Sequence, residues 1–168
     1  LLERYRPEQI GIYGASAGAI LSAQTAAFLL ARKLPLPGAI GMIAGAAHPF
    51  YGDSYYLTEA LYRHPLPPPT QEQNHYVNPY ASSVDVDDPC FFPGKSPQIM
   101  AKFPPSLLMA STRDVGLSSV VVTHSQLVRL GVKTELHVWE GQEHCFHYNP
   151  ELAESQELYR VLSGFFDR

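Results

Sequence analysis

The stretch GIYGASAGAILSA, residues 11–23, places one serine between two glycines, after a short apolar run and before a long one. A Gly-x-Ser-x-Gly turn between a strand and a helix bends the chain sharply and exposes the serine hydroxyl at the helix N-terminus. We expect that glycine stands at positions 14 and 18 because a side chain at either position would clash with the neighbouring strand or helix. A helix-capping serine fits the same short pattern, so the turn alone leaves the role of Ser16 open.

Alternating apolar runs and helical segments around this turn predict a parallel sheet. The first strand ends at Gly14, and an apolar helix follows from Ala17 to Lys33 with its cations in the last turn. Further strands are expected over 38–46, 106–111 and 133–140, and further helices over 117–130 and 151–166, while residues 1–8 are expected to end a helix at Pro7. Strands separated by helices form βαβ units, which build an α/β fold with a mostly parallel sheet and flanking helices.

The middle of the chain has a different composition. Nine of the 15 prolines and six of the 10 tyrosines lie within residues 48–97. We expect an irregular excursion there, with one short helix around residues 55–62, and long insertions of this kind are often lids or walls of a site. Four residues after the second strand could line an acyl pocket or serve only in packing: His48, Phe50, Tyr51 and Tyr55.

Three polar residues follow predicted strands, where active sites of parallel sheets lie. They are Ser16, Asp114 and His144. A serine hydroxyl needs a histidine to take its proton, and the histidine needs a carboxylate to orient it and stabilise its charge. Asp114 by itself would also serve as a cap for the helix near Leu117. The order Ser, Asp, His along the chain is the one expected of α/β-hydrolases.

Other histidines and acids compete for functional roles. His147 is an alternative base three residues beyond His144, and His124 fits a packing or surface position on its helix. The grouping of His144, Cys145 and His147 lacks a second ligand cluster, so we expect no metal. The acidic residues Asp85, Asp87 and Asp88 fit a solvated loop and lack the spacing of a calcium-binding loop.

Several segments together resemble the C-terminal half of the hormone-sensitive-lipase-like family of α/β-hydrolase carboxylesterases. These are YGASAGA, PPSLLMASTRDVGLSS and THSQLVRLGVKTELHVWEGQEHCFHYN, with the final helix. The resemblance implies a three-layer α/β/α fold. It implies that Ser16 is the nucleophile, Asp114 the acid and His144 the base, within a Gly-x-x-His-x-Phe pattern. The backbone N–H of Ala17 would then contribute to the oxyanion hole, and no cofactor or metal is implied.

The chain departs from the family pattern at two places. Ala15 and Ala19 stand where many members carry Asp and Gly, and residues this small should be tolerated. The His-Gly-Gly loop that supplies other oxyanion donors, and the strands before it, have no counterpart here. Because the chain also begins without Met, we expect residues 1–168 to be one partial domain whose N-terminal strands are missing. Losing even one oxyanion donor costs roughly 10²–10³ in rate.

Composition narrows the class of partner. The net charge is −4 with no basic block, which argues against a nucleic-acid surface, and no apolar run reaches the roughly 20 residues of a membrane span. Two cysteines favour a reducing compartment such as the cytoplasm. We therefore expect a serine carboxylesterase for short acyl esters or lactones, of undetermined oligomeric state. The alternatives are a non-catalytic fragment or pseudoenzyme, and a peptidase of the prolyl-oligopeptidase type.

Overall fold

The computed structural model describes residues 1–61, 85 and 88–168, and a four-stranded sheet forms its centre. The strands are β1 (Gly11–Ala15), β2 (Ala39–Ile43), β3 (Ser106–Arg113) and β4 (Thr134–Glu143), and they lie side by side in this order. Each neighbouring pair is parallel. The predicted parallel sheet is therefore confirmed.

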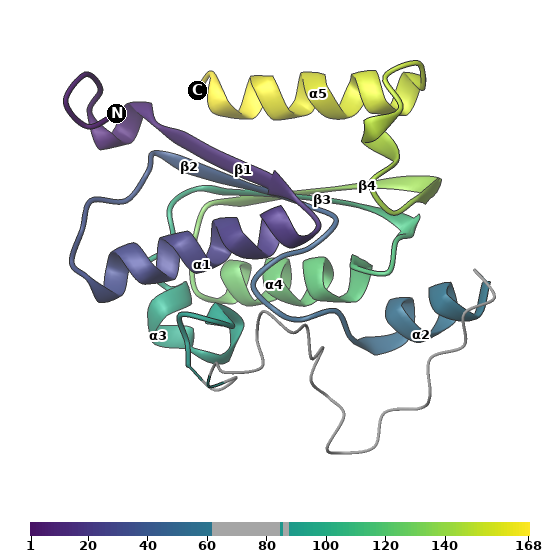
Figure 1. Cartoon of the computed structure of the whole chain (residues 1–168), viewed down its shortest axis with the longest axis horizontal. Helices are drawn as coiled ribbons and strands as arrows, with labels where there is room; N and C mark the ends of the chain where they lie inside the picture. Colours follow the sequence, from purple (N-terminus) through teal and green to yellow (C-terminus); the bar gives the residue numbers. More distant parts are fainter. Residues whose placement is uncertain (62–84, 86–87) are drawn as a thin grey trace.

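Helices cover both faces of the sheet and make three layers (Figure 1). Helices α1 (Ala17–Ala31) and α4 (Leu117–Arg129) lie on one face, and α5 (Ala153–Phe166) lies on the other. Residues of β3 alternate between the two faces: Leu108 packs in the cluster with α1 and α4, and Leu107 and Met109 pack in the cluster with α5. Burial on both faces explains why this strand is apolar at every position from 107 to 110.

Two helical predictions near the N-terminus were wrong. Residues 1–6 form no helix; a short 3₁₀ helix, η1 (Pro7–Gln9), instead begins at the proline that was expected to end one. Helix α1 stops at Ala31, before the two cations, because Lys33 adopts a left-handed conformation with φ 54°. The N–H groups of Lys33 and Leu34 then donate to the carbonyls of Leu30 and Leu29, a pairing that closes the helix end.

Strands β3 and β4 are longer than predicted. Each continues two or three residues further, to Arg113 and Glu143, which pair across a register irregularity after Ser111. The hydroxyl of Ser111 donates to the carbonyl of Glu143, and the N–H of Gly141 donates to the hydroxyl of Thr112. These contacts hold the two strand ends together beyond the regular ladder, so the residues predicted to begin loops belong to the sheet.

The excursion contains helix α2 (Gly52–Leu61), which confirms the short helix predicted around residues 55–62 but begins three residues earlier. A short 3₁₀ helix, η3 (Pro93–Lys95), and helix α3 (Pro97–Met100) lead back to β3, and η4 (Phe146–Tyr148) follows β4. Residues 62–84 and 86–87 lie outside the described part, including Asp87 of the acidic group. Over the described ranges, no helix is long and apolar enough to cross a bilayer. That residues 1–168 form one partial domain stays a prediction.

Candidate active site

Ser16 lies in the turn between β1 and α1 with φ 54° and ψ −117°. This backbone conformation is rare for a residue with a side chain, and it is maintained because the turn is tied on both sides. The N–H of Ser16 donates to the carbonyl of Ile43 in β2 (2.8 Å), and its own carbonyl accepts from the N–H of Ala19 (3.0 Å). The turn therefore directs the side chain away from the sheet, at the start of the helix.

The two glycines around Ser16 have different roles. A Cβ atom at Gly14 would lie 2.3 Å from the carbonyl oxygen of Gly18, so the strand and the helix approach each other too closely for any side chain. A Cβ atom at Gly18 would meet no atom of the described residues within 4 Å. The expectation that a side chain would clash is thus confirmed at Gly14, and among the described residues no such clash occurs at Gly18.

This difference predicts opposite outcomes for two alanine variants. Gly14→Ala should lower the free energy of unfolding by about 1–3 kcal/mol, because backbone must move to admit the methyl group. Gly18→Ala should leave stability equal or slightly higher, since alanine is favoured over glycine in helices by up to about 1 kcal/mol. Urea unfolding of the two variants in the full-length protein checks this. Equal destabilisation by both variants would contradict the assignment.

Asp114 is the first residue after β3 and its carboxylate is buried. Its Oδ1 accepts a hydrogen bond from the N–H of Gly116 at 2.7 Å. Gly116 itself is the N-cap residue of α4, and it lies close to Ala44, the residue after β2: a Cβ atom at Gly116 would be 2.6 Å from the carbonyl oxygen of Ala44. Asp114 therefore supports the turn before the helix, but it is not the helix cap.

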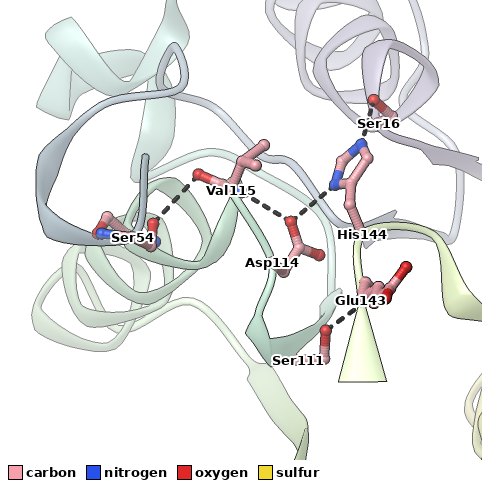
Figure 2. Close-up of polar contacts among 9 residues, drawn as sticks. Ser16, Ser54, Ser111, Asp114, Val115, Glu143 and His144 are labelled. Atoms are coloured by element: carbon pink, nitrogen blue, oxygen red, sulfur yellow. Dashed lines mark hydrogen bonds and ion pairs between the residues drawn. The ribbon is translucent and has the colours of Figure 1, made fainter. Parts of the chain in front are cut away.

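His144 directly follows β4 and connects the other two residues (Figure 2). Its Nδ1 lies 2.7 Å from Oδ1 of Asp114, and its Nε2 lies 2.9 Å from Oγ of Ser16. In the neutral ring, Nδ1–H donates to the carboxylate and Nε2 accepts from the serine hydroxyl. All three predicted residues thus form one hydrogen-bonded chain, each placed immediately after a strand of the same sheet.

The surroundings of His144 favour its charged form. Burial of the imidazole disfavours the positive charge, but hydrogen bonds and charge interactions with Asp114 and Cys145 outweigh burial and raise the pKa of His144 to about 10. The ring of Phe50 lies edge-on to the imidazole, with 5.7 Å between ring centroids. The carboxylate thus stabilises the imidazolium, the species that forms when histidine takes a proton from serine.

The alternative base, His147, is turned into the core. It belongs to η4, is almost fully buried and packs against the rings of Phe146 and Tyr159. Burial lowers the pKa of His147, although the charge of Asp114 acts in the opposite direction. The structure therefore brings His144, and not His147, into contact with Ser16.

The remaining candidate residues from the sequence differ in what they contact. Of the four residues that could line a pocket, Phe50 contacts His144, whereas His48 binds the side chain of Gln126 through Nε2. His124 is half-buried on α4, and Cys90 and Cys145 are free thiols. Throughout the part of the chain described, no group of three or more acidic, histidine or cysteine side chains could hold a metal ion.

Ala17 is the first residue of α1 and directly follows Ser16. The first N–H groups of a helix have no acceptor within that helix, and they carry its partial positive charge. The N–H of Ala17 is therefore positioned beside the serine hydroxyl by chain connectivity alone. Its role as an oxyanion donor stays a prediction.

Sequence and structure comparisons identify similar proteins. A family model described as the alpha/beta hydrolase fold matches residues 2–148. No curated protein matches the chain. Among solved structures, esterase E25 is 29% identical with a TM-score of 0.81, and the match covers 98% of this chain and 50% of that one.

Two further solved structures are more distant in sequence. An esterase from the bacterial hormone-sensitive lipase family is 20% identical, with a TM-score of 0.81 and coverage of 98% of this chain and 55% of that one. Carboxyl esterase 2 from the fungus Tuber melanosporum is 22% identical, with a TM-score of 0.74 and coverage of 95% and 54%. The chain thus spans about half the length of these esterases. The family match and these structures confirm the resemblance found in the sequence.

Proposed function

Because the chain belongs to the α/β hydrolase fold family, we propose that it forms the catalytic half of a serine carboxylesterase that cleaves short acyl esters or lactones. The observation that carries this proposal is the hydrogen-bonded chain from Ser16 through His144 to Asp114. Ser16 is the nucleophile, His144 the general base and acid, and Asp114 the group that orients the imidazole. The reaction needs no cofactor or metal ion.

The geometry supports a two-step acyl transfer. Oγ of Ser16 attacks the ester carbonyl carbon while Nε2 of His144 takes the hydroxyl proton, and the N–H of Ala17 stabilises the oxyanion that forms. The imidazolium returns the proton to the departing alcohol oxygen, which leaves an acyl group on Ser16. Water then attacks the acyl carbon, His144 again moves the proton, and the carboxylic acid is released.

A fluorophosphonate probe tests the proposed nucleophile, because it labels only activated serines. We expect the full-length protein to be labelled on the tryptic peptide that contains Ser16, and to hydrolyse p-nitrophenyl acetate or butyrate. Labelling of another serine would contradict the assignment. Absence of both labelling and hydrolysis would favour a non-catalytic protein, and faster cleavage of prolyl peptides than of esters would favour a peptidase.

The raised pKa of His144 predicts an alkaline activity profile. His144 accepts a proton only when neutral, so kcat/KM should rise with pH above neutrality and level off only near pH 10. Stability depends on pH in the opposite direction. The ion pair between His144 and Asp114 contributes fully to the free energy of unfolding below about pH 6.5. That contribution is lost as pH approaches 10. Kinetics from pH 6 to 10 and NMR titration of the imidazole check this, and a profile already flat at pH 7 would contradict it.

A further inference from the structure

Helices α2 and α4 cap each other through two serines. Oγ of Ser54 accepts a hydrogen bond from the N–H of Ser118 (2.8 Å), and Oγ of Ser118 accepts one from the N–H of Ser54 (3.2 Å). Both serines lie in the first turn of their helix, where backbone N–H groups have no acceptor within the helix. Each side chain therefore satisfies a donor of the other helix, and the two helix starts are fixed to one another.

The two serines differ in one contact. The hydroxyl of Ser54 also donates to the carbonyl of Val115, at 3.1 Å, and Val115 directly follows Asp114. Figure 2 shows Ser54 on one side of Val115, with Asp114, His144 and Ser16 on the other. The short segment 114–116 is thus held at the carbonyl of Val115 by Ser54, and at the N–H of Gly116 by the carboxylate itself.

We propose that Ser54 is a positioning residue, which holds Asp114 in line with Nδ1 of His144 by fixing the carbonyl of Val115 and the first turn of α4. This inference rests on the proposed function, because it concerns Asp114, the proposed acid of the hydrogen-bonded chain from Ser16 through His144. A shift of about 1 Å in a catalytic group can cost roughly 100-fold in rate, so a hydrogen bond that limits such a shift affects turnover. Ser54 acts through Asp114 and does not touch the reacting atoms.

Ser118 offers a matched control, because Ser118→Ala removes one of the two capping contacts and leaves the contact with Val115. In the full-length protein, Ser54→Ala should lower kcat for p-nitrophenyl butyrate by roughly 10- to 100-fold with KM changed by less than about twofold. Ser118→Ala should keep kcat within about threefold of the wild type. Ser54→Thr keeps the hydroxyl and should restore most of the turnover.

NMR titration of His144 gives a readout that does not depend on activity. A less firmly held carboxylate stabilises the imidazolium less, so the pKa of His144 should be lower in Ser54→Ala than in Ser118→Ala. Should Ser54→Ala not fold, Ser54→Cys replaces it, since the thiol has similar size and is a weak hydrogen-bond partner.

Equal kcat values and equal His144 titrations in the two alanine variants would overturn the positioning role. Failure of the proposed function has a different signature: wild-type protein that neither hydrolyses esters nor reacts with a fluorophosphonate. The NMR titration still tests the positioning role in that case, because the pKa of the His144 imidazole depends on how closely Asp114 is held to it.

Discussion

Replacing Ser16 with alanine is expected to lower kcat for ester hydrolysis on the order of 10⁶-fold and to abolish labelling by a fluorophosphonate. The variant removes only Oγ, which lies 2.9 Å from Nε2 of His144. Alanine must adopt the same left-handed conformation as Ser16, with φ near 54°, so the backbone strain is similar in both proteins. The loss is therefore chemical and not a consequence of unfolding.

Rates with p-nitrophenyl butyrate, together with a thermal melt of each protein, measure this effect. Ser163→Ala is a suitable control, because Ser163 is exposed on α5 and its hydroxyl contacts only the carbonyl of Arg160 among the contacts described. The control should hydrolyse and label as the wild type does. Hydrolysis by Ser16→Ala at more than about one per cent of the wild-type rate would exclude Ser16 as the nucleophile.

Asp114→Asn is expected to lower kcat by about 10⁴-fold. Asparagine has nearly the same shape, so the buried site should remain filled, but its amide nitrogen can face Nδ1 of His144 only by giving up the hydrogen bond that Oδ1 accepts from the N–H of Gly116. The amide is neutral, however, and can present an N–H to Nδ1 of His144, which favours the wrong tautomer of the ring. The proton of Ser16 then has no acceptor at Nε2.

The pH dependence of kcat shows whether the wrong tautomer of His144 or only its lowered pKa sets the rate of Asp114→Asn. Without the carboxylate, the pKa of His144 should fall from about 10 toward its usual value of 6.5, and more of the ring becomes neutral at pH 7. If protonation alone limited the rate, Asp114→Asn would be faster than the wild type at neutral pH. Kinetics at pH 7 and pH 9, with exposed Asp53→Asn as the control, decide between the two causes. A rate within tenfold of the wild type would reassign the acid.

Local patterns predicted the sheet and the three residues of the site. Apolar runs followed by turns indicated all four strands, and the strand-turn-helix context made Ser16 a candidate whose role the turn alone left open. Asp114 and His144 could be chosen because the carboxyl ends of parallel strands meet at one edge of the sheet. The resemblance to a known family assigned a role to each, and these catalytic roles stay predictions.

Element ends were less predictable, because contacts between distant residues set them. Strand β4 reaches Glu143 through its pairing with Arg113 and the hydrogen bond from Ser111, which join residues about 30 positions apart. This extension makes His144 the first residue past the strand. Whether a Cβ atom would fit at Gly14 or at Gly18 likewise depends on which residues lie next to each glycine in the folded chain.

The four strands, and the residues that follow each of them, could be found from the sequence because periodicity, turn residues and chain connectivity are local properties. Which side chains meet depends on packing between distant segments and is seen only in the folded chain. In the folded chain His147 lies in the core and His144 faces Ser16, while Phe50 reaches His144 and Ser54 reaches Val115, the residue after Asp114. Nothing local marks Ser54, because its partners lie 61 and 64 residues away and reach it through the packing of α2 against α4.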